Sequence, residues 1–336
     1  MSIPSTGDLA RSFFLRQSHE RARGDLSTLT EEMASGTHAD MGRALKGDFT
    51  ALAGVERGLR LFESYKSAAA EATLTTGASQ AALQTVQDSL SGLAPELLSA
   101  TASGSLQQMD LMAASAPDRL SAMVSALNQS AAGRSLFAGA ATDRNALAPV
   151  ADITAALEPL AAGAVDAADL ITTLESWFMD PGGGFETLAY QGNPDAPPGV
   201  LVAEGETVQN PASALDPGLR RGLMGMALAA LVATGAGSFP GADKRALLEH
   251  AALSMTSGNE GITGLRARIG HAEGRIEAAQ LRNDTARGQL ELERGRLTGV
   301  DPYRTATELQ QAEARLESLY LLTSRLARLS LTEYLR

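Results

Sequence analysis

The feature that most constrains this chain is the spacing of apolar residues near its two ends. At both ends these residues recur at alternating intervals of four and three, the pattern of coiled-coil helices. At the N-terminal end the positions include Leu15, Leu26, Leu29 and Met33. At the C-terminal end they include Leu309, Leu316, Leu319, Leu326 and Leu329. Helices of similar length at the two ends can pair antiparallel and bury each other's stripe.

Helix signals fill most of the first 132 residues. We expect one helix from about Asp8 to Ala34, and a second, much longer one capped by Asp48. Pro95 is expected to end or kink this long helix, because proline cannot donate the backbone hydrogen bond. A further helix is predicted over 106–132, with a bend at Pro117.

The middle of the chain is predicted to hold its β structure. Residues 150–180 are rich in alanine and read as weakly helical. Two strand-like stretches follow, 185–190 and 199–208, separated by a proline-rich turn over 193–198, so we expect a β-hairpin. The apolar run after Asp216 is shorter than the roughly 20 residues that span a bilayer, and we interpret it as a buried helix.

The last third returns to long helices. One is predicted to begin near Asp243 and to stop before Gly258 or Gly261, with the next running over 262–297. The final helix is expected to begin at Asp301 and to continue to the end of the chain.

These elements predict a mainly α fold. Long antiparallel coiled-coil helices from both termini form nested, discontinuous domains, with a small α+β domain inserted between them. We place the terminal coiled-coil domain at 1–45 plus 300–336 and a long-helix bundle at 46–150 plus 241–299. The inserted, outward-facing domain with the hairpin is placed at 151–240.

Composition excludes several kinds of chemistry. The chain has no cysteine, which rules out disulfides, thiolate metal sites and cysteine nucleophiles. Its net charge of −11 argues against binding nucleic acid or anionic membranes. The four histidines lack metal-ligand spacing, and His19 falls on the apolar seam of the first helix. No catalytic motif is present, so we predict no catalytic, cofactor-binding or metal-binding residue.

Two functional classes stay open on these grounds. The chain is either an assembly protein that uses its terminal helices, or an enzyme or ligand-binding protein with an unrecognised site in the middle segment. Spacing alone does not decide, because the two stripes can also satisfy each other within one monomer. The N-terminus shows no cleavable secretion signal.

Residues at both ends are more specific than a heptad pattern. Residues 7–10 and 29–36 resemble the start of flagellar hook–filament junction proteins of the FlgL type. Residues 301–310 and 316–336 resemble the closing helix of the same family, and residues 133–139 resemble a turn-and-strand element shared with flagellins. Flagellin itself is the near alternative, but residues 37–43 and the last seven residues depart from flagellin patterns.

The resemblance implies a structural adaptor that is secreted through the flagellar export channel and located at the hook–filament junction. Its implied partners are a hook-side junction protein of FlgK type, flagellin, an export chaperone of FlgN type, and copies of itself in a ring. The implied assembly interface consists of the nine apolar seam residues named above. A filament-forming flagellin or minor flagellin stays as the alternative.

Overall fold

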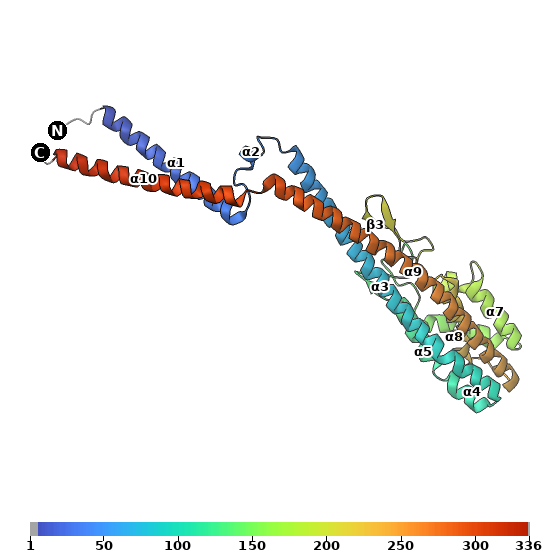
Figure 1. Ribbon diagram of the computed structural model, residues 1–336. Helices are drawn as coiled ribbons and strands as arrows, with labels where there is room; N and C mark the ends of the chain where they lie inside the picture. The colour runs from blue at the N-terminus through green and yellow to red at the C-terminus, as the bar shows by residue number, and fades with distance from the viewer. Residues whose placement is uncertain (1–5, 335–336) are drawn as a thin grey trace. The chain divides into compact units, whose positions relative to one another are not determined.

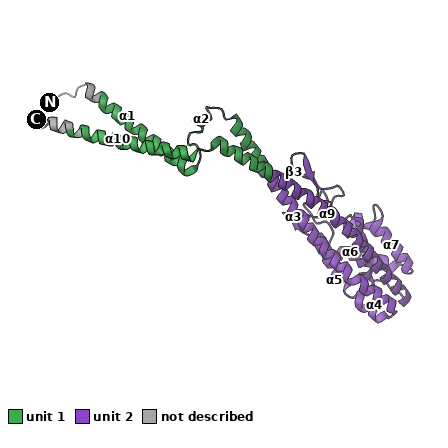
Figure 2. Cartoon of the chain, viewed as in Figure 1, with its two compact units in different colours: residues 1–62, 284–336 green, residues 63–283 purple. Residues whose placement is uncertain are grey.

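The computed structural model describes the backbone of residues 6–334 and the side chains of residues 10–326 and 328 (Figure 1). The chain forms two compact units (Figure 2). Unit 1 comprises residues 1–62 and 284–336, and unit 2 comprises residues 63–283. The predicted mainly α fold with a few short strands is confirmed.

Unit 1 is built from both ends of the chain. It contains α1 (Thr6–Ser35), the short α2 (Met41–Ala44) and α10 (Pro302–Tyr334), with the first residues of α3 (Thr50–Ser103) and the last residues of α9 (Gly241–Thr298). The predicted caps form. The Asp48 carboxylate accepts a hydrogen bond from the Thr50 amide at 2.9 Å, and that of Asp301 accepts one from the Tyr303 amide at 3.0 Å. These bonds satisfy amides that a helix leaves unpaired at its N-terminus.

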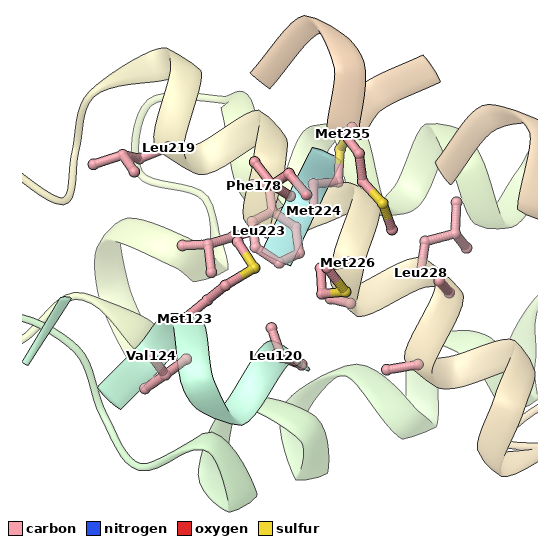
Figure 3. Packing of buried hydrophobic residues seen from close by; sticks show 14 of the residues in the cluster. Leu120, Met123, Val124, Phe178, Leu219, Leu223, Met224, Met226, Leu228 and Met255 are labelled. Carbon is pink, nitrogen blue, oxygen red and sulfur yellow. The ribbon is translucent and has the colours of Figure 1, made fainter. Parts of the chain in front are cut away.

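Unit 2 packs its helices around α8 (Pro217–Thr234), an almost wholly buried helix. Its neighbours are α4 (Leu106–Ala113), α5 (Ala116–Leu127), α6 (Val150–Gly163) and α7 (Ala167–Met179). Figure 3 shows Met224 and Met226 of α8 packed among Met123 of α5 and Phe178 of α7. The remaining elements are β1 (Ser130–Ala131), β2 (Arg134–Ser135), the π-helical turn η1 (Phe185–Ala189), β3 (Val200–Ala203) and β4 (Glu206–Val208). Thus the apolar run after Asp216 is a core helix, as predicted.

Helix α3 corrects one half of the expectation that Pro95 ends or kinks the helix. It does not end at Pro95 but continues to Ser103. The residues around that proline, Leu93, Ala94 and Leu97, are buried in the main core. Their packing offsets the hydrogen bond that proline removes. By contrast, the helix predicted over 106–132 breaks into α4 and α5, with Pro117 in the first turn of α5, where its missing N–H costs little.

Helix α9 corrects a second expectation, because it runs without a break through Gly258 and Gly261. These glycines mark a close crossing with α8. A Cβ on Gly258 would lie 2.5 Å from the Gly222 nitrogen, and one on Gly261 would lie 2.6 Å from the Gly218 Cα. The glycines therefore do not end the helix but allow the backbones of α8 and α9 to come into contact. This close packing offsets their poor helix propensity.

The predicted hairpin exists with different strands. It consists of β3 and β4, which pair antiparallel with Val200 opposite Val208, and it turns at Gly205, whose φ is +68°. The stretch 185–190 is not its partner strand but contains η1, with Phe185 and Ala189 buried on one side. Buried residues four apart are the helical spacing, whereas a strand alternates every two.

The boundaries that we predicted for three domains stay a prediction. The structure places residues 151–240 inside unit 2, where α6, α7 and α8 share one hydrophobic core with α3, α4, α5 and α9. The hairpin forms a smaller separate cluster with Ala69 and Ala72 of α3 and Ile276 of α9.

Candidate assembly interface

The candidate site is the pair of terminal helices α1 and α10 in unit 1. They lie side by side and antiparallel (Figure 1). The C-terminal end of α1 lies beside the N-terminal end of α10, and α1 stops there at Gly36, whose φ is +70°. The backbone amide of His38 then donates to the Thr298 carbonyl at 2.8 Å, and that of Val300 donates to the Gly36 carbonyl at 3.1 Å. These two bonds tie the chain leaving α1 to the chain entering α10.

Aromatic packing sets the register further along the pair. The ring of His19 meets the ring of Tyr320 edge to face, with centroids 4.6 Å apart. His19 thus packs in the seam, as an apolar-face histidine does, and the described residues hold no group of side chains able to bind a metal. Edge-to-face contact of this kind stabilises a pair by about 0.5–1.5 kcal/mol beyond area burial.

The seam between the two helices buries little. Among the described side chains of α1 and α10, only Ala22, Thr305 and Ala312 are fully buried. The predicted interface residues that the structure leaves half-buried are Leu15, Leu26, Leu29, Leu309, Leu316, Leu319 and Leu326. Met33 is 45% exposed, and the side chain of Leu329 lies outside the described residues. Whether these residues bind a partner stays a prediction.

Large apolar side chains that the seam does not use are exposed on the same helices. Phe13 and Phe14 of α1 are 64% and 67% exposed. On α10, Tyr320, Leu321 and Leu322 are each about half exposed or more. Apolar surface of this extent on a two-helix pair is typical of a surface that another protein covers.

A wide groove of about 1190 Å³ lies beside the connected ends of the two helices. Leu29 of α1, Ala44 of α2, and Val300 and Ala312 contribute its apolar lining. Its rim is charged, and the Glu32 carboxylate holds the loop by accepting a hydrogen bond from the Ala39 amide at 3.1 Å.

Charge is divided unevenly between the two units. The residues of unit 1 include sixteen Lys and Arg and sixteen Asp and Glu, so unit 1 has no net charge. Unit 2 has twelve against twenty-three and therefore carries the whole net charge of −11. Copies of unit 1 can approach one another without net repulsion, whereas copies of unit 2 repel.

Sequence reasoning missed two features of this site. Thr305 begins the C-terminal seam, and the four-three spacing from Thr305 to Leu309 and Ala312 was the signal for it. The exposed pair Phe13 and Phe14 was missed because it lies off the seam. No helix among the described residues has the length and apolarity needed to cross a membrane.

Comparisons with known proteins show the fold and no more. No protein family matches the sequence, and no curated protein matches it. The fold resembles the solved structure of a protein provisionally described as a flagellar hook-associated protein from Vibrio parahaemolyticus, with a TM-score of 0.55 and 19% identity. The match covers 75% of this chain and 99% of that one. The two proteins therefore share a mainly α architecture over most of their lengths.

Proposed function

We propose that this protein is a non-enzymatic structural adaptor of the bacterial flagellum, joining the hook-side junction to the flagellin filament. In this proposal it is exported through the flagellar channel and assembles through α1 and α10. Its partners are a hook-side junction protein of FlgK type, flagellin, an export chaperone of FlgN type, and further copies of itself.

One observation carries the proposal: α1 and α10 pair, yet together they do not bury their own seam. Seven of the predicted seam leucines stay half-buried, and Phe13 and Phe14 are exposed. Two long helices with one shared stripe gain too little apolar burial to offset the ordering of some sixty residues, at about 1–2 kcal/mol per backbone residue. Further helices packed around this pair would supply the missing burial.

The comparison and the charge distribution support the same function. The solved structure of similar fold is described as hook-associated, and the residues at both ends of this chain resemble junction proteins. The neutral unit 1 suits close packing of copies, and the acidic unit 2 suits an outward position where copies are further apart.

Deletion of the gene tests the proposal directly. We expect electron microscopy of the deletion strain to show hooks without filaments, with flagellin shed into the medium. Normal filaments would contradict it, and restoration by the full-length gene supplied in trans is the control.

A proline substitution tests the role of α10. Leu319→Pro removes a backbone hydrogen bond in the middle of α10 and costs about 3 kcal/mol or more of local helix stability. We expect loss of swimming motility, measured in soft agar with the secreted variant quantified in parallel. The matched control is Ala196→Pro, at an exposed position beside two prolines. Equal motility of the two variants would refute a role for α10 in assembly.

A further inference from the structure

Along its axis, the α1–α10 pair consists of a basic half followed by an acidic half. The basic half comprises residues 6–23 of α1 and 318–334 of α10, with six arginines and three carboxylates. The acidic half comprises residues 24–35 and 301–317, with seven carboxylates and two arginines. The contact between His19 and Tyr320 and the tie between His38 and Thr298 show that the two segments of each half are neighbours.

Most of these charges are exposed and lack an ion-pair partner among the residues that the structure describes. In the basic half this holds for Arg11, Arg16, Arg21, Arg23 and Arg325. In the acidic half it holds for Asp25, Glu31, Glu313 and Glu317. The ion pairs within this two-helix pair and its loop include those of Glu32 with His38, of Asp40 with Arg43 and of Arg304 with Glu308.

The monomer makes no use of this arrangement. An antiparallel pair that served only itself would place opposite charges on facing helices, whereas here like charges are neighbours in each half. The order of charges on α1 also runs against the helix dipole, which favours carboxylates at the N-terminus and cations at the C-terminus. Helix α1 has four arginines in its first eighteen residues and no basic residue in its last turn.

We propose that a second copy of this chain docks against the pair, with its basic half on the acidic half of the first copy. The inference rests on the proposed function, because it describes how the assembling helices recognise each other. The two pairs point in the same direction in this arrangement. Each half has about fifteen residues per helix, so neighbouring pairs are then displaced by about 23 Å along their axes at 1.5 Å per residue. The two faces in contact differ, so the contact is heterologous and leads to a ring or a helical array.

Apolar groups are placed to act in the same contact. Phe13 and Phe14 project from the basic half, and the groove lined by Leu29, Val300 and Ala312 belongs to the acidic half. The displacement that matches the charges therefore also brings exposed aromatic rings towards the apolar part of this groove. Charge steers and aligns the two copies, and apolar burial stabilises the contact.

Disulfide trapping tests the arrangement, because the chain has no cysteine of its own. One variant carries Ser324→Cys in the basic half and a second carries Ser27→Cys in the acidic half, both at exposed positions. At about 20 mM NaCl, where the Debye length is about 20 Å, we expect the mixed dimer to form about tenfold faster than either homodimer. At about 500 mM NaCl this preference should largely disappear.

Charge reversal gives the matched variants. R11E/R16E/R21E makes both halves acidic, and D25K/E313K/E317K makes both halves basic. In the trapping assay, the mixed dimer should not form when both copies carry the same charge-reversed triple. It should form again when one copy carries one triple and the second copy carries the other. The triple variant on α1 places carboxylates beside Arg325, so it should not unfold the pair, which circular dichroism checks.

Several results would overturn the inference. These are equal rates for mixed dimer and homodimers, no trapping at all, or insensitivity of the mixed dimer to salt and charge reversal. Such results leave the flagellar role intact, because the deletion phenotype tests that role independently. A double variant in unit 2, R144E/E204K, controls for a general effect of altered charge, and it should trap like the parent.

Discussion

The crossing of α8 and α9 predicts opposite effects for one substitution at two positions of the same helix. Gly258 and Gly264 both lie in α9 within unit 2. Replacing a helical glycine by alanine ordinarily stabilises a helix by up to about 1 kcal/mol. A Cβ on Gly264 would meet no atom within 4 Å, so Gly264→Ala should stabilise unit 2 by about 0.5–1 kcal/mol.

Gly258→Ala should do the reverse. The new Cβ would lie 2.5 Å from the Gly222 nitrogen, 2.6 Å from its Cα and 3.0 Å from the Gly218 carbonyl oxygen. Ordinary contacts are about 3.5–4 Å, so the two backbones must separate by roughly 1 Å. Such overpacking costs about 1–3 kcal/mol, and all three opposing atoms are backbone atoms that cannot rotate away. After the gain in propensity, we expect a net loss of about 1–2 kcal/mol.

The assay is denaturant unfolding followed by the fluorescence of Trp177, the single tryptophan of the chain. It lies in α7 of unit 2, with its ring 4.6 Å from that of Phe178, so its emission reports the unfolding of this unit. The unfolding midpoint should rise for Gly264→Ala and fall for Gly258→Ala. If Gly258→Ala stabilised unit 2 as much as its control, the close crossing would be wrong.

Two further predictions concern polar contacts. Arg220 donates to the Phe178 carbonyl at 2.5 Å and to the Glu186 carboxylate at 2.9 Å. Arg220→Met should therefore destabilise unit 2 by about 2–4 kcal/mol, measured as a lower unfolding midpoint. An unchanged midpoint would refute the role of this contact. The hydroxyl and the amide of Thr50 donate to Asp48 and hold the pKa of its carboxyl below its usual value, so this cap is fully formed above about pH 4 and is lost as the pH falls through the lowered pKa. The protection of amides at the start of α3, taken relative to the intrinsic exchange rate at each pH, should therefore fall at low pH in the parent but not in Asp48→Asn, and an equal pH dependence in both would contradict it.

The sequence predicted best what depends on local patterns. A buried helix was predicted after Asp216, and α8 does begin at Pro217, where the Asp216 carboxylate accepts a hydrogen bond from the Gly218 amide at 2.9 Å. The long terminal helices followed from four-three spacing in the same way. These features need only residues a few positions apart, so the sequence contains the whole signal.

The errors share a different cause, because each depended on a distant part of the chain. Gly258 was interpreted as a helix stop because glycine has a poor helix propensity. The sequence did not show that the backbone of α8 lies against this position. Residues 185–190 were interpreted as a strand, yet residues 185–189 form a helical turn whose Glu186 pairs with Arg220, thirty-four residues away. Pairing a buried charge contributes more free energy than local secondary-structure propensity, so such contacts decide the local structure.

The candidate interface shows both sides of this limit. Spacing predicted the seam but could not show how little of it two helices bury, because burial depends on how many helices surround the stripe. Leu316 and Leu319 are half-buried by one partner, and a third helix against them would complete their burial. In the proposed function, this incomplete burial is what makes the order of α1 and α10 depend on assembly. The proposed export of the chain agrees with helices of this kind, because they gain stability where neighbouring copies are present.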